Sequence, residues 1–264
     1  NTVLDDNKVL TLSNGDRILM TPEMKAMFEP ENLNNASPAT VSRAGIIYVS
    51  DVELGWEPVA KSWLADRTNK FLRPADEEHL FPLLQKYVTP LLKANGVAWR
   101  SPVANQEVCL VQYMLDLLEA LIKPAADENK AVTPDMYEKF VVYAAAWTIG
   151  GSLTPKDRMT FHHKLMEIEP KFLPQVSEAE ESIFDFVVGD SGEWEHWADR
   201  VPTWTYPKGV EKPEYASLVI PTMDSVRIQY VMQRFCSVKA RPGAEGFKGR
   251  PVLLVGDAGT AKST

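Results

Sequence analysis

A loop near the end of the chain has the residue types and the spacing that phosphate binding requires. The P-loop pattern is glycine, four residues, glycine, lysine, then serine or threonine; Gly256, Lys262 and Ser263 fit it, and Ala261 replaces the second glycine. Backbone N–H groups of such a loop bind phosphate oxygens, the lysine adds positive charge, and the serine hydroxyl is a ligand for Mg²⁺. We therefore predict a nucleotide and Mg²⁺ site, with Ser263 as the metal ligand, at Gly256, Asp257, Ala258, Gly259, Thr260, Ala261, Lys262, Ser263 and Thr264.

The alternative for this loop is a glycine-rich turn between a strand and a helix, with the lysine on the surface. The strand expected at residues 251–255, followed in order by glycine, lysine and hydroxyl, favours the phosphate site. The sequence ends at Thr264, before the helix that a P-loop needs. We therefore expect a piece of a longer protein that has no activity alone.

Composition argues against several classes of function. The 264 residues are 45% hydrophobic and 24% charged, as in globular proteins with sizeable cores. The net charge of −8 argues against a nucleic-acid surface, and the most apolar run, residues 140–149, is too short to span a bilayer. We expect no nucleic acid and no membrane as partners.

Neither the cysteines nor the histidines have the spacing of a metal site. Cys109 and Cys236 each lie in an apolar helical pattern, so we expect two buried and reduced thiols. His162 and His163 are adjacent and point to different sides of a helix, so we expect them on a solvated surface.

The first part of the chain is predicted to contain short strands. Asn14-Gly15 between two apolar runs predicts a hairpin of residues 8–12 and 17–20. A further strand is expected over 25–29, ending at Glu29.

Arg43 lies between a predicted helix and a predicted strand. Residues 38–43 predict a short helix with proline at its first position, and 44–49 a buried strand. Arg43 would then lie at the edge of a parallel sheet, where ligands and neighbouring subunits bind. The alternative is an ordinary surface arginine.

The middle of the chain is predicted to be helical. Apolar periodicity, Thr-Pro starts and a Gly-Gly stop predict helices over 56–67, 76–95, 105–123, 134–149 and 155–168. We expect the second to be broken at Pro82 and Pro90. The third has a wide apolar face, so it should be central to a bundle.

A stretch rich in proline and tryptophan follows. Residues 183–188 and 203–206 could form strands, and a helix is predicted from Pro221-Thr222 to Phe235. The tryptophans could form a sugar or peptide platform, but we favour a connector that they pin onto neighbouring domains.

These elements predict an α/β fold with a large α-helical part. We divide it into the end of a parallel-sheet core (1–51), a helical lid (52–170), a connector (171–217) and the start of the next core (218–264).

Several stretches resemble dynein heavy chains. They are residues 1–8, 13–18, 28–45 with its Ser-Pro-Ala-Thr-Val-Ser-Arg, 147–151, 219–227 and 252–262. The resemblance covers essentially the whole chain. It is to the end of the second AAA+ module and the P-loop of the third, and axonemal chains are the more similar type.

The resemblance implies roles for single residues. Dyneins are ATP-driven motors that move toward microtubule minus ends with a ring of six AAA+ modules. Arg43 is similar in position to the arginine finger that the second module contributes to the first module's ATP site. Glu29 is similar in place to a sensor of the γ-phosphate, a role that Asn or Thr usually fills, and Arg158 to the second sensor.

The resemblance also implies location and partners. We expect an axoneme of a cilium or flagellum, within the cytoplasm and cytoskeleton. The expected partners are other AAA+ modules of the same chain, microtubules through the full-length motor, and dynein intermediate and light chains. The acidic residues of both modules' ATP sites are missing, so we expect no complete ATP site here.

Two alternatives remain open for the function. One is a non-catalytic nucleotide-binding scaffold module of a AAA+ ring. The other is a free-standing P-loop enzyme such as a small kinase, which would need a domain behind the loop.

Overall fold

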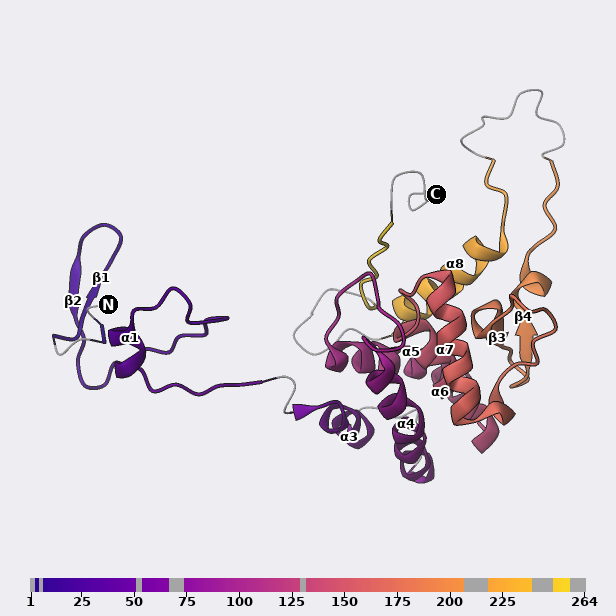
Figure 1. Cartoon of the computed structure of the whole chain (residues 1–264), viewed down its shortest axis with the longest axis horizontal. Helices are drawn as coiled ribbons and strands as arrows, with labels where there is room; N and C mark the ends of the chain where they lie inside the picture. The colour runs from indigo at the N-terminus through magenta and orange to yellow at the C-terminus, as the bar shows by residue number, and fades with distance from the viewer. Residues whose placement is uncertain are drawn as a thin grey trace. The chain divides into compact units, whose positions relative to one another are not determined.

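The computed structural model describes residues 3–4, 7–50, 54–66, 74–128, 132–206, 218–238 and 249–256. The chain divides into two compact units, Asn1–Glu53 and Leu54–Thr264 (Figure 1). None of the helices among the described residues is long and apolar enough to cross a membrane.

The unit Asn1–Glu53 contains a hairpin and a short helix. Strands β1 (Val9–Thr11) and β2 (Arg17–Leu19) pair antiparallel, with Leu10 opposite Ile18. Gly15 in the turn has φ +92°, a conformation that favours glycine, which explains why Asn-Gly predicts this hairpin. Helix α1 spans Pro38–Arg43. The predictions of this hairpin and this helix are confirmed.

The predicted strands of a parallel core are not formed by the described residues. Residues 25–29, 44–49 and 251–255 have no regular structure, and Ile47 and Leu253 are 88% and 85% exposed. The described part of the chain is mostly helical and holds two small antiparallel sheets. These segments have the apolar composition of strands, but a parallel strand forms only against neighbouring strands, and none of the described residues supplies them.

The unit Leu54–Thr264 is built from helices. They are α3 (Glu57–Ala65), α4 (Pro74–Ala94), α5 (Glu107–Asp127), α6 (Pro134–Thr148), α7 (Pro155–Ile168) and α8 (Met223–Ser237). Between α7 and α8 lie the 3₁₀ turns η1 (Pro170–Phe172), η2 (Ile183–Asp185) and η3 (Trp197–Arg200), with strands β3 (Phe186–Val188) and β4 (Trp194–His196) paired antiparallel.

Local start signals account for the helix boundaries. Thr133 and Thr154 accept hydrogen bonds from N–H groups in the first turns of α6 and α7, and each is followed by proline. The break predicted within α4 is wrong, because the helix runs through both prolines. Pro82 is exposed, so water can bind the carbonyl that loses its N–H partner, while buried neighbours such as Tyr87 hold the helix on the core.

The core lies between α5 and α6. Met114, Leu115 and Leu118 of α5 are fully buried, as are Val141 and Tyr143 of α6. Helix α5 also packs against α3 and α8, so its predicted central place is confirmed. In Figure 1 these helices form one bundle, and the β3–β4 hairpin lies beside α6.

The tryptophan-rich stretch packs onto this bundle. Trp194 Nε1 donates a hydrogen bond to the Phe172 carbonyl (2.9 Å), and buried Trp197 contacts the Tyr230 ring of α8 at 5.3 Å. Of the strand predicted over 183–188 only 186–188 forms. None forms over 203–206, where Tyr206 is exposed.

Two predictions about single side chains are wrong. Cys236 is exposed and Cys109 is half-buried, because α8 and the start of α5 each turn that side away from the core. His162 is buried, since it lies three residues before the buried Leu165 and therefore on the same face of α7.

Candidate functional site

Arg43 is the last residue of α1. Ser37 starts this helix by accepting the Thr40 N–H at 3.2 Å, and Pro38 follows it. The Arg43 side chain is exposed, at a helix C-terminus where positive charge is favourable. The structure therefore presents this guanidinium on the surface of its unit, at the end of a capped helix.

Glu29 belongs to the same unit and is also exposed. The strand that was expected to end at this residue is absent, and the segment around it has no regular structure. Phe28, beside it, is exposed as well.

Arg158 lies in the first turns of α7 and is half-buried. Its Nη2 donates a hydrogen bond to the Gly151 carbonyl at 2.9 Å, and its guanidinium lies over the Phe184 and Trp147 rings at 4.8 and 5.9 Å. Burial, and next the nearby positive charge of Arg227, lower the pKa of Arg158. These contacts hold the side chain in one place in the helical unit.

The cleft beside Arg158 joins α7, the segment before β3, and α8. Its volume is about 490 Å³, and Lys156, Ser182, Asp185 and Arg227 are among its lining residues. Asp185 pairs with Arg227 at 3.2 Å. Three positive side chains (Lys156, Arg158 and Arg227) and two negative ones (Glu180 and Asp185) line the cleft, so its charges are nearly balanced.

The predicted phosphate loop lies almost wholly outside the described residues. Only Gly256 belongs to them, and it is exposed; residues 257–264, with Lys262 and Ser263, do not. Within the described ranges no group of three or more His, Cys, Asp or Glu could hold a metal ion. ATP and Mg²⁺ binding at this loop stay predictions.

A polar network in the core was missed by sequence reasoning. Glu138 of α6 accepts hydrogen bonds from Lys86 Nζ (2.5 Å) and from the Tyr87 hydroxyl (2.6 Å), and Lys86 also pairs with Glu169 at 3.2 Å. Burial alone would lower the pKa of Lys86, but its hydrogen bonds to Glu138 and Glu169 outweigh this and raise it. The available signal was a glutamate at a core-facing position of an apolar helix.

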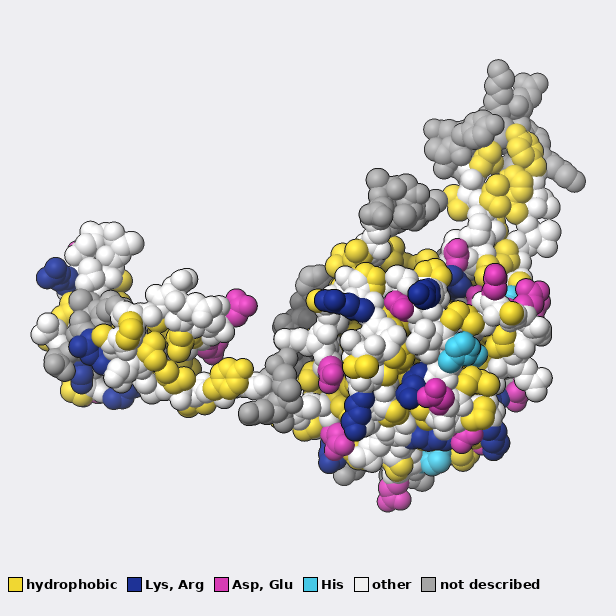
Figure 2. Space-filling view, in the orientation of Figure 1, with side chains coloured by type: hydrophobic (Ala, Val, Ile, Leu, Met, Phe, Trp, Pro, Cys, Tyr) yellow, Lys and Arg dark blue, Asp and Glu magenta, His cyan; other side chains and the backbone are white. Residues whose placement is uncertain are grey.

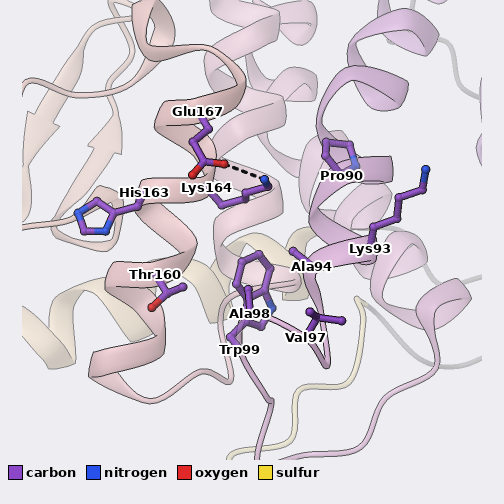
Figure 3. Close-up of a pocket in the computed structure, with 10 residues that line it drawn as sticks. All are labelled: Pro90, Lys93, Ala94, Val97, Ala98, Trp99, Thr160, His163, Lys164 and Glu167. Carbon is purple, nitrogen blue, oxygen red and sulfur yellow. Dashed lines mark hydrogen bonds and ion pairs between the residues drawn. The ribbon is translucent and has the colours of Figure 1, made fainter.

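A second cleft opens between α7 and the end of α4 (Figure 3). Its volume is about 480 Å³, and Pro90, Ala94 and Trp99 contribute its apolar side. Lys164 pairs with Glu167 at 2.7 Å and points toward α4, whereas the His163 ring points away (Figure 3). The groove therefore has an apolar wall on the side of α4 and paired charges on the side of α7.

The surfaces of the two units differ in the side chains that they expose. On the visible face of the unit Leu54–Thr264, Lys and Arg side chains alternate with Asp and Glu (Figure 2). In the unit Asn1–Glu53, exposed hydrophobic side chains gather along the segment that leads to residue 50 (Figure 2).

The helical unit matches a known domain. Residues 80–199 match the family model of the dynein heavy chain AAA lid domain. Over its whole length the chain is 46% identical to a dynein gamma chain of the flagellar outer arm from Chlamydomonas reinhardtii, and 34% identical to dynein axonemal heavy chain 5 from Mus musculus and to dynein axonemal heavy chain 8 from Homo sapiens. The helices α4 to α7 and the β3–β4 hairpin are therefore an AAA lid domain. The chain belongs to the dynein heavy chain family.

The chain spans a small part of these relatives: 6% of the Chlamydomonas protein and 5% of the mouse protein. The flagellar and axonemal relatives indicate the axoneme of a cilium or flagellum as its location.

Proposed function

We propose that the chain is part of an ATP-driven, minus-end-directed microtubule motor of cilia or flagella. The names of the relatives support this, as does the AAA lid domain, because a dynein AAA domain implies ATP binding and dynein heavy chains are ATPases. The activity belongs to the whole heavy chain, and the 264 residues contribute parts of it.

Arg43 is the residue to which we assign a catalytic role, as an arginine finger at the neighbouring ATP site. The observation that carries this assignment is the exposed guanidinium at the C-terminus of a capped helix in Ser-Pro-Ala-Thr-Val-Ser-Arg. A finger must reach across an interface, and its charge stabilises negative charge on the transferring phosphoryl group.

The other assignments follow the same family pattern. Glu29 is proposed as the γ-phosphate sensor and Arg158 as the second sensor, a role that the fixed place of Arg158 at the edge of a cleft supports. Residues 256–264 would hold the phosphates of the next site, where Ser263 would bind Mg²⁺.

The proposed domain division is that of the sequence prediction, 1–51, 52–170, 171–217 and 218–264. The partners that we propose are neighbouring AAA+ modules, microtubules through the whole motor, and dynein intermediate and light chains.

The test is Arg43→Ala in the full-length heavy chain. We expect microtubule-stimulated ATP turnover to fall by about tenfold or more while ATP binding is retained, because the finger acts on the transition state. Lys25→Ala, which removes another exposed cation of the same unit, is the matched control and should turn over ATP normally. Unchanged turnover in Arg43→Ala would remove the assigned role.

A further inference from the structure

An ion pair joins the lid to the residue just before the predicted P-loop strand. Arg250 Nη2 donates a hydrogen bond to Asp116 Oδ1 at 2.9 Å, across 134 positions of sequence. Asp116 lies on α5, the central helix of the lid, and only residues 251–255 separate Arg250 from Gly256.

Asp116 is an unexpected residue at this place. Its side chain is 4% exposed, and its neighbours Leu115 and Leu117 are fully buried. A buried carboxylate is costly unless it is paired, and a well-packed apolar pair in the same place is often equally stable. Stability alone therefore does not account for a buried ion pair here, whereas fixing the position of Arg250 does.

The backbone at Arg250 is fixed as well. The Arg250 N–H donates to the Phe235 carbonyl at the end of α8 (3.0 Å). Gly249 has φ +86°, and a Cβ on it would lie 2.3 Å from the Cys236 carbonyl oxygen, so the chain passes α8 at a distance that only glycine allows. Arg234 of α8 donates to the Ala120 carbonyl of α5 at 3.3 Å.

These contacts set the direction in which the chain leaves the lid. The side chain of Arg250 is fixed on α5 of the lid and its N–H on α8, while Val252 to Val255 beyond it are exposed. The contacts of Arg250 thereby fix the position, relative to α5, of the chain that leads into the predicted loop.

We propose that Asp116 and Arg250 are a positioning pair for the ATP phosphates, through which the lid sets the affinity of the following P-loop for nucleotide. This inference rests on the proposed function, in which residues 256–264 bind ATP. Coupling is reciprocal, so nucleotide at the loop stabilises the lid around Asp116 by the same factor as the intact pair strengthens nucleotide binding.

The experiment measures nucleotide affinity in the full-length heavy chain. Titration with a fluorescent ATP analogue, carried out on the wild type and on Lys262→Ala, defines the binding that depends on this loop. Asp116→Asn and Arg250→Gln should each weaken that binding by about tenfold. The double variant should bind no more weakly than either single one, because each substitution already breaks the pair.

Arg250→Lys keeps the charge and should recover part of the lost affinity. Arg200→Gln removes a guanidinium from a pair with Glu195 in the same unit, and should leave the affinity unchanged. Melting temperatures separate loss of fold from loss of coupling: a folded Asp116→Asn chain that binds the analogue within about twofold of the wild type overturns the inference.

Hydrogen exchange supplies a second measure. Saturating analogue should slow exchange of α5 amides around residue 116 in the wild type and not in Arg250→Gln. Equal slowing in both would overturn the pair's role.

If Lys262→Ala binds the ATP analogue like the wild type, the loop has no phosphate site and the proposed function at 256–264 fails. If Lys262→Ala loses binding and the pair variants do not, the positioning role alone is wrong.

Discussion

The two units differ in how far their apolar side chains are buried. In the helical unit, Leu118 and Val141 and their neighbours are fully buried between α5 and α6. In the unit Asn1–Glu53, Ile47 and Val49 belong to an equally apolar segment and are 88% and 86% exposed. Burial therefore does not follow from hydrophobicity alone, because it also needs elements to pack against.

The difference comes from how each kind of element satisfies its backbone. A helix makes its hydrogen bonds within itself and needs only an apolar stripe and a neighbour, and the lid supplies several such helices. A strand of a parallel sheet needs other strands, which are distant in sequence. The lid thus folds from its own residues, while segments 25–29 and 44–49 do not find partners in the described chain.

Truncation of a core leucine should have the largest effect. Leu118→Ala should reduce the free energy of unfolding by about 2–5 kcal/mol, because it removes buried apolar atoms and leaves a cavity in the lid. Ile47→Ala, at an exposed side chain, should change the free energy of unfolding by less than about 0.5 kcal/mol. Urea denaturation followed by circular dichroism measures both. A comparable loss from the two substitutions would mean that the exposed segment packs as tightly as the lid.

Removal of the buried Glu138 carboxylate should have an intermediate effect on the free energy of unfolding. Glu138→Ala removes the acceptor of the buried Tyr87 hydroxyl and one of the two carboxylates that pair with Lys86, which should cost about 1–3 kcal/mol. Glu193→Ala breaks the pair with Lys139, in which Glu193 is 76% exposed, and should cost less than about 1 kcal/mol. Denaturation of the two variants under identical conditions gives the comparison, and equal losses would rule out a structural role for the Glu138 network.

The effect of pH on His162 should be the smallest. His162 Nδ1 accepts the Ile183 N–H at 3.3 Å, and burial, followed by the nearby His163, lowers the pKa of His162. Below pH 6.5 the unfolded chain binds a proton that the folded chain does not, so stability should fall as the pH falls.

The expected loss is at most about 1.4 kcal/mol per pH unit, and it should be reduced in His162→Gln. His79→Gln, at an exposed histidine, is the control and should keep the wild-type slope. Unfolding free energies measured between pH 7 and pH 5 test this (roughly the window below the unfolded histidine pKa). If the unfolding free energy of His162→Gln depended more steeply on pH than that of the wild type, the role assigned to His162 would be contradicted.

The sequence predicted what is local. Caps such as Thr133 and Thr154 and the Asn14-Gly15 turn act within a few residues, and they gave correct starts and a correct hairpin. The burial of His162 could have been predicted too, since it lies three residues before the apolar Leu165, on the same helix face.

Contacts between distant residues could not be predicted in this way. Asp116 and Arg250 are 134 positions apart, and Lys86 and Glu138 are 52 apart, so periodicity gives no sign of either pair. The roles of Arg43, Glu29 and Arg158 came from family resemblance, because an arginine at a helix end is common and its pattern alone does not indicate chemistry.

Native-state hydrogen exchange of the 264-residue chain tests the contrast between the two units most directly. We predict that amides of α5 and α6 exchange about a thousandfold more slowly than those of residues 44–49, because the former open only when the lid core unfolds. Protection of residues 44–49 equal to that of α5 would contradict the account, since it would show that this segment is held by partners within the chain.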